Sequence, residues 1–123
     1  MEIIWDFPSP PTSLYDGPVL KSQGGRQFSL EFSFENERGD IENKCFTFKN
    51  VWAYRCDFLY AIRRDLMEKS YGKLVELPSH AWLEEIRYKE GQYGSSAVFT
   101  KVFVITFDDG PCYQFLCEQV SVT

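Results

Sequence analysis

The sequence predicts an α+β fold: a mainly antiparallel sheet of about six or seven strands, strongly curved or folded as a sandwich or partial barrel. One amphipathic helix and one short helix complete it. Three observations predict this fold: a hairpin signal late in the chain, an alternating strand early in it, and helical periodicity between the two. With 123 residues, 44% of them hydrophobic and 17% aromatic, residues 1–123 suffice for one domain with a real core and are too few for two.

The strongest local signal is the hairpin at residues 97–122. Two runs rich in Val, Ile, Phe and Tyr flank the turn sequence DDGP at 108–111, where Asp tolerates and Gly supplies the positive φ of a tight turn. A two-residue turn at 109–110 would place Lys101 opposite Glu118, a favourable pair of opposite charges. Both runs are apolar on both faces, which is typical of strands covered on both sides.

The first half of the chain reads as strands joined by turns. Residues 2–5 predict a short strand, and residues 6–18 contain four of the six prolines, which exclude a helix or a central strand there. We expect this segment to be an ordered connector. Residues 27–35 alternate Phe or Leu with Ser or Glu, the pattern of a half-buried strand. Residues 41–56 predict one long bent strand or two, with a bend or bulge at 49–50.

Helical periodicity begins near Phe58. Apolar residues recur on one face of residues 58–70 and charged residues on the other, and Gly72 is a suitable C-cap. Residues 74–77 form a short strand-like run. Ser79 can cap a second short helix over residues 80–87.

The charge of the chain limits its partners. A net charge of −5 and a pI near 4.9 disfavour nucleic acid and anionic lipid, and they suit a basic protein. No apolar run approaches the roughly 20 residues of a membrane helix. The first residues lack a secretory signal, so we expect a cytoplasmic protein if the chain is complete.

Catalytic and metal-binding patterns are missing from the sequence. The four cysteines form no CxxC pair, and Cys112 and Cys117 should point to opposite faces of one strand, so we expect reduced thiols and no zinc site. The single histidine, His80, excludes multi-histidine metal sites, and a helix-start or surface position explains it. The sequence therefore predicts a protein that is not an enzyme and carries no cofactor.

Two acidic pairs and three aromatic residues are candidates for partner binding. Turn formation alone explains the first pair, and the solvated face of a short helix explains the second, so both interpretations stay open. The candidates are Asp108, Asp109, Glu84, Glu85, Tyr93, Tyr113 and Trp82.

The sequence FDDGPCYQFLCEQV at residues 107–120 resembles a C-terminal signature of small, mostly uncharacterised bacterial proteins of similar length. Some of these look like immunity proteins that guard a cell against a toxin. The resemblance implies a non-enzymatic, acidic inhibitor that masks a protein toxin, and it implies no catalytic residue. The alternative is a small-molecule binder or cryptic enzyme with an aromatic-lined pocket, with polar groups such as Arg55, Gln114 or His80. A subunit of a homo-oligomer is a third reading, and the oligomeric state is not indicated.

Overall fold

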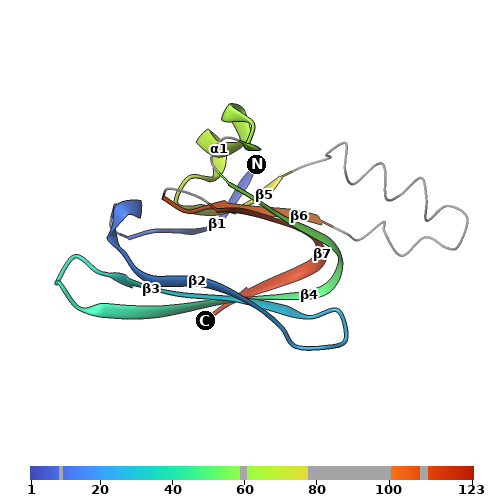
Figure 1. Ribbon diagram of the computed structural model, residues 1–123, viewed down its shortest axis with the longest axis horizontal. Helices are drawn as coiled ribbons and strands as arrows, with labels where there is room; N and C mark the ends of the chain where they lie inside the picture. The colour runs from blue at the N-terminus through green and yellow to red at the C-terminus, as the bar shows by residue number, and fades with distance from the viewer. Residues whose placement is uncertain (9, 59–60, 78–100, 109–110) are drawn as a thin grey trace, which may run out of the picture.

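The structure, a computed structural model, describes residues 1–8, 10–58, 61–77, 101–108 and 111–123. These residues form one antiparallel sheet of seven strands with a short helix and a 3-10 turn (Figure 1). The short helix expected at residues 80–87 lies outside the described residues. The elements are β1 (Glu2–Asp6), η1 (Pro11–Ser13), β2 (Leu14–Ser22), β3 (Phe28–Glu35), β4 (Ile41–Asp57), α1 (Arg64–Ser70), β5 (Lys73–Leu77), β6 (Lys101–Thr106) and β7 (Cys112–Val122).

The strand order is β1-β5-β6-β7-β4-β3-β2, and every neighbouring pair is antiparallel. The sheet is open, with β1 and β2 at its two edges. Figure 1 shows it folding back on itself along the long strands β4 and β7, so that β1 and β5 lie above β2 and β3. The antiparallel sheet and the strand number are confirmed. The α+β class holds only roughly, because the described residues are mainly strand.

Strand β3 forms where the alternation predicts it. Leu30, Phe32 and Phe34 lie on the concave side, where at most 4% of each residue is exposed. The ladder between β3 and β4 runs without a shift from Phe28 opposite Phe48 to Glu35 opposite Ile41. The other face of β3 carries Ser29, Glu31 and Ser33. We call it the outer face.

Residues 41–57 form one long bent strand, β4, and not two separate strands, which was the other possibility left open by the sequence. Its pairing with β7 shifts by one residue between Val51 and Ala53, so Trp52 is the extra residue of a β-bulge. Just before the bulge, Asn50 has a positive φ of 55°, and its amide donates a hydrogen bond of 2.7 Å to Glu118. The bulge lets β4 belong to both halves of the folded sheet.

Aromatic rings fill the space between the two halves. Trp5 of β1 contacts Phe32, Phe34 and Phe46 at centroid distances of 5.4 to 5.9 Å, although β1 and β3 are far apart in the strand order. Edge-to-face pairs of this kind contribute about 0.5–1.5 kcal/mol beyond the burial of area. The ring cluster therefore holds the two halves together on the side where their edge strands, β1 and β2, share no hydrogen bonds.

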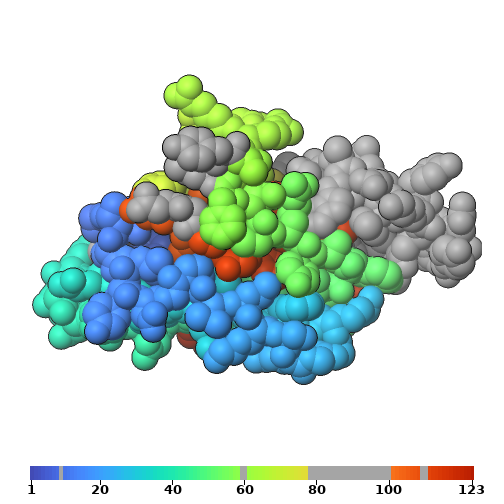
Figure 2. All heavy atoms as spheres, viewed as in Figure 1, coloured from blue at the N-terminus to red at the C-terminus, as the bar shows by residue number. Residues whose placement is uncertain are grey.

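A second, smaller core lies on the opposite side of β5, β6 and β7, under α1. It contains Val75, Val102, Val104, Cys112 and Leu116, and Ile62 and Leu66 pack against it. At the end of α1, the Ser70 hydroxyl contacts the Thr106 hydroxyl at 2.8 Å. Figure 2 shows α1, in yellow-green, standing out from the surface at the top of the view.

Helix α1 is shorter than the predicted range 58–70. Strand β4 continues to Asp57, and the helix begins only at Arg64. Arg63 at the N-cap is extended and makes no capping hydrogen bond, because its guanidinium has no acceptor for the first N–H groups. Gly72 has a positive φ of 65°, but its N–H bonds to the Thr106 carbonyl instead of closing the helix.

The hairpin of β6 and β7 is present in a register one residue away from the expected one. Lys101 pairs with Cys117 instead of Glu118. The Phe107 N–H donates to the Pro111 carbonyl at 3.0 Å, so three residues, and not two, connect the closing pair. Lys101 forms its ion pair with Glu76 of β5 at 3.5 Å. The expected register was wrong, and every β7 side chain consequently lies on the opposite face.

Replacing a ring of the aromatic cluster should destabilise the fold strongly. Phe34 has no exposed surface and contacts both Trp5 and Phe7, so we expect Phe34→Ala to lower the free energy of unfolding by about 3–5 kcal/mol. Tyr15→Ala is the control, because Tyr15 is 70% exposed, and it should change stability by less than about 0.5 kcal/mol. Urea denaturation measures both. Equal losses in the two variants would contradict the assignment of the core.

Candidate functional site

The structure places two of the seven predicted partner-binding residues. Glu84, Glu85, Trp82, Tyr93 and Asp109 lie outside the described residues. Asp108 is partly exposed at the end of β6, and its carboxylate accepts a hydrogen bond from the Tyr71 hydroxyl. This bond ties the hairpin loop to the residue that follows α1.

Tyr113 does not lie at the rim of a binding surface. It is only 7% exposed and lies in the aromatic cluster, 6.2 Å from Phe107 and 6.3 Å from Phe115 between ring centroids. Burial, and secondarily the neighbouring Cys56 thiol, raises the pKa of Tyr113 to about 12. Tyr113 is thus a core residue of this chain, a consequence of the shifted register.

Among the described residues, aromatic side chains occupy the interior of the folded sheet, where the alternative hypothesis would place its pocket. The rings of the concave side fill that space, with Phe48 and Phe115 stacked at 3.8 Å. Arg55 pairs with Asp57 at 2.9 Å on the surface, and Gln114 is buried. These two groups do not converge with each other on a cavity among the described residues.

The described residues contain no cluster suited to a metal ion, and three of their cysteines have thiols with raised pKa values. No group of three or more His, Cys, Asp or Glu side chains among them could hold a metal ion. Burial raises the pKa of the Cys112 thiol, raises that of Cys117 to about 12, and raises that of Cys56, whose thiol is partly desolvated beside Tyr113. These thiols therefore stay protonated at neutral pH, where a nucleophilic cysteine would need a thiolate.

The turn between β3 and β4 carries the densest acidic surface of the described chain. Four exposed carboxylates lie within eight residues, beside the single basic residue Arg38: Glu35, Glu37, Asp40 and Glu42. In Figure 1 this turn and the Asp108 loop lie at the same end of the molecule, at the left. The sequence interpretation treats residues 36–40 only as a turn, although the local excess of acidic residues is visible there. We call residues 35–42 the acidic turn.

Hydrogen bonds of Asn36 fix the shape of the acidic turn. The Asn36 side-chain oxygen accepts from the N–H groups of Arg38 at 2.9 Å and Asp40 at 3.0 Å, and its amide donates to Glu42 at 3.1 Å. The Gly39 N–H also donates to the Asn36 carbonyl. The backbone of the turn is therefore ordered before any partner binds, which lowers the entropy cost of binding.

A groove of about 470 Å³ lies on the outer face of β2, β3 and β4. This volume is within the range of small-ligand sites, and we call the hollow the outer groove. No signal in the sequence predicts it, because it depends on how β2 lies beside β3. Its lining residues are Asp16, Gly17, Val19, Glu31, Phe32, Ser33, Asn43, Lys44, Cys45 and Thr123.

Strand register arranges the polar side chains of the outer groove in two rows. Asp16, Ser33 and Asn43 are cross-strand neighbours in the first row. In the second row, Glu31 pairs with Cys45, whose backbone exchanges two hydrogen bonds of 2.9 Å with Thr123. The rows are two residues apart along β3 and β4, a separation of about 6.6 Å.

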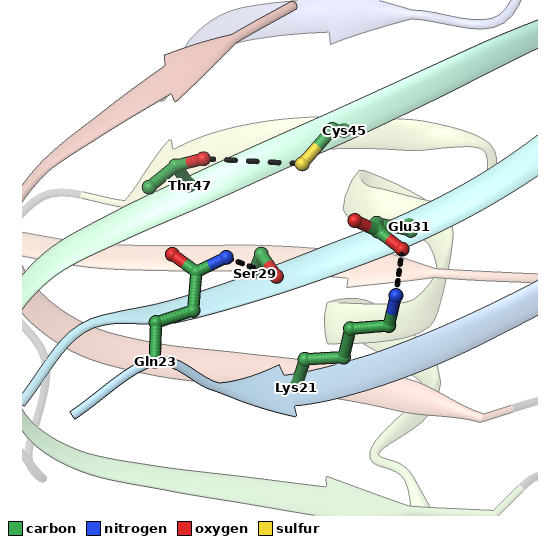
Figure 3. Close-up of polar contacts among 6 residues, drawn as sticks. All are labelled: Lys21, Gln23, Ser29, Glu31, Cys45 and Thr47. Carbon is green, nitrogen blue, oxygen red and sulfur yellow. Dashed lines mark hydrogen bonds and ion pairs between the residues drawn. The ribbon is translucent and has the colours of Figure 1, made fainter.

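Figure 3 shows three separate polar pairs on these strands, two of which include a residue of the second row. Lys21 pairs with Glu31 at 2.6 Å, and the hydrogen bond with Glu31 raises the pKa of the Lys21 ammonium. The Cys45 thiol lies 3.9 Å from the Thr47 hydroxyl. A cation is thus already held at the edge of the outer groove.

A bulge in β2 shapes the wall of the outer groove. Pairing with β3 shifts between Asp16 and Val19, so that Gly17 and Pro18 together oppose Phe32. Gly17 has a φ of 88°, and a Cβ at this position would lie 2.8 Å from the Glu31 carbonyl oxygen. Only glycine lets the edge strand approach β3 this closely.

Comparisons with known proteins give no family for the chain. No family model matches it, and no curated protein or solved structure matches it either. The described helices include none with the length and apolar character needed to span a membrane.

A side chain at Gly17 should disturb the β2 bulge. Gly24 is the control, because it also has a positive φ (76°) but has empty space where a Cβ would lie. We expect Gly24→Ala to lower the free energy of unfolding by about 1 kcal/mol through the strain of this φ alone. Gly17→Ala adds a clash with backbone atoms, so we expect at least about twice that loss. Thermal unfolding of the two variants measures the difference. Equal effects would show that Gly17 is needed only for its φ.

Stability should fall at high pH. The folded-state pKa values of Tyr113 and Cys117 are both about 12, against ordinary values of 10.0 and 9.0. The unfolded chain therefore loses these protons first, and the stabilisation, complete below about pH 9, is lost as the pH rises towards 12. We expect a loss of more than about 1 kcal/mol between pH 8 and 11 by urea denaturation.

The variant Tyr113→Phe separates this effect from the titration of exposed lysines and tyrosines. It lacks the ionisable hydroxyl and keeps the ring, so its stability should fall less than that of the unmodified protein over the same pH interval. An identical fall in both proteins would show that Tyr113 does not contribute.

Proposed function

We propose that this chain is a non-enzymatic binding protein that masks a basic protein partner, in the manner of an immunity-type inhibitor of a toxin. The observation that carries the proposal is the acidic turn, whose four exposed carboxylates stand on a backbone that Asn36 holds in place. The net charge of −5 gives the whole molecule the same preference for a basic partner. The resemblance of residues 107–120 to small bacterial proteins agrees with this role.

Exposed apolar side chains on β2 and β4 supply contact area beside the charges of the acidic turn. Tyr15, Val19 and Ile41 belong to β2 and β4, and all three are largely exposed. Tyrosine is favoured at the centre of protein interfaces, because its ring buries area and its hydroxyl hydrogen-bonds. In this proposal Tyr15 takes the anchoring role that the sequence interpretation gave to Tyr113.

The charges would act mainly on the rate and specificity of association. Complementary charge steers a basic partner to the acidic turn and excludes acidic competitors. The bound state would then depend on the apolar contacts and on hydrogen bonds that exclude water. This division predicts an association rate that falls steeply with salt and a dissociation rate that changes little.

Charge reversal within the acidic turn tests the proposal. The double variant Glu37→Lys, Asp40→Lys changes the net charge by four and keeps Asn36 and Gly39, which order the turn. The double variant Glu2→Lys, Asp6→Lys makes the same change of charge on exposed positions of β1. Each immobilised protein is exposed to lysates of host cells and neighbouring strains at low and moderate salt, and retained proteins are identified.

We expect the unmodified protein to retain a basic protein at low salt, with association at least about tenfold slower for the turn variant than for the β1 variant. Equal retention by both variants would show that only net charge matters and would reject the acidic turn as the site. Retention of no protein by the unmodified chain would count against an inhibitor of this kind.

A further inference from the structure

The outer groove has a chemical character that the acidic turn alone does not explain. Three of its hydrogen-bonding side chains lie in the first row, and each is an acceptor or can act as one: the Asp16 carboxylate, the Ser33 hydroxyl and the Asn43 amide oxygen. Glu31 adds a second carboxylate one row away. A ligand that satisfies these groups must carry several donors.

Ser33 is a mostly buried residue whose hydroxyl oxygen keeps some access to the outer groove, and it is not among the fully buried polar atoms that lack a partner. It is 7% exposed and lines the outer groove, and no described residue hydrogen-bonds to its hydroxyl. Buried hydroxyl groups are nearly always hydrogen-bonded, because leaving one unpaired costs stability. The Ser33 hydroxyl on the floor of the groove is therefore available to hydrogen-bond a ligand or water above it.

The charges facing the outer groove are negative except at its edge. Asp16 and Glu31 face it, whereas the Lys44 ammonium lies over the Trp5 ring at 5.9 Å, and Trp5 packs in the concave core. Lys21 is the only described cation paired with a groove-lining carboxylate, and its pairing with Glu31 leaves Asp16 without a cation. One Asp16 oxygen accepts from the Gly17 N–H at 2.9 Å, and the other is available to a ligand.

From this arrangement we propose that the outer groove binds a guanidinium group. The acceptors of the first row stand on adjacent strands about 4.8 Å apart. A planar guanidinium presents five N–H donors in a fixed fork that can span two such acceptors, whereas an ammonium is a point charge. The Asp16 carboxylate neutralises the charge, and the Ser33 and Asn43 oxygens accept the remaining donors.

The guanidinium has two sources: an arginine side chain of the basic partner, or a free small guanidinium compound. The first source deepens the proposed function and rests on it, and the groove is continuous with the acidic turn, because Ser33 and Asn43 are two residues from Glu35 and Ile41 along β3 and β4. Val19 and Ile41 would then contact the aliphatic part of the arginine and its neighbours.

Model compounds test the groove without knowledge of the partner. The isotope-labelled full chain is titrated with N-acetyl-arginine methylamide and with its citrulline counterpart, which has nearly the same shape and no charge. We expect a Kd on the order of 1 mM for the arginine compound, with amide shifts centred on residues 16–19, 31–33 and 43–45. The citrulline compound should bind at least about tenfold more weakly.

Variants locate the binding. Asp16→Asn keeps an acceptor for the Gly17 N–H and removes the charge, so arginine binding should weaken at least about fivefold. Glu2→Gln removes one carboxylate on β1, outside both the groove and the acidic turn, and should leave binding unchanged. Asn43→Leu, at an exposed position, is the second groove variant and should also weaken binding.

The Cys45 thiol gives an independent readout at the site. Cys45 lines the groove and Cys56 is an exposed cysteine elsewhere, so the arginine compound should slow alkylation of Cys45 relative to Cys56. Equal binding of arginine and citrulline compounds, equal effects of Asp16→Asn and Glu2→Gln, or shifts confined to the acidic turn would each overturn the proposal.

The two sources give different affinities. Methylguanidinium that binds with a Kd below about 10 µM would identify a free small compound as the ligand, and millimolar binding fits one side chain of a larger partner. Because these titrations use no partner protein, loss of lysate retention by the acidic-turn variant and failure of guanidinium binding are separate results.

Discussion

The fold depends on aromatic packing across a sheet that does not close. β1 and β2 remain edge strands, so no hydrogen-bonded ladder closes the two free edges of the folded sheet onto each other. Trp5 meets Phe32, Phe34 and Phe46 across the interior instead. Ring contacts are short-ranged and shape-dependent, so the curvature of the sheet is set by the volume that these rings fill. The β4 bulge at Trp52 supplies the bend that this curvature needs.

That internal packing decides where function can lie. With its concave side filled and α1 covering part of the opposite side, the sheet leaves the outer face of β2, β3 and β4 and the acidic turn as accessible polar surface. Both features stand on strands whose inward side chains are fixed in the core. The outer groove and the ordered turn are therefore rigid surfaces, suited to a partner or ligand that meets them without rearrangement.

The sequence predicts well the elements that carry one polar face and one apolar face, and poorly those that are apolar on both faces. Strand β3 follows its alternation because a slip would bury Glu31 among phenylalanines. In the β6–β7 hairpin a slip of one residue carries no such penalty, because both faces are apolar. The sequence DDGP permits a connection of two or of three residues. The Lys101–Glu118 charge pair favours the two-residue connection, whereas the structure has the register of the three-residue one. Lys101 finds Glu76 instead, on a strand that no local pattern relates to it. The outer groove depends likewise on a register shift at Gly17, and the burial of Tyr113 on the hairpin register, neither of which is legible in the sequence.

The strand order has a consequence for the order of folding. β4 pairs with β3 on one side and with β7, the last of the seven strands, on the other. A growing chain can form the local meander of β2, β3 and β4 early, but half of β4 then presents an unpaired edge until β7 has been synthesised. β1 waits in the same way for β5, some seventy residues later. Such non-local pairing slows folding and exposes apolar strand edges meanwhile, so the chain is most prone to aggregation before β5 and β7 have been synthesised.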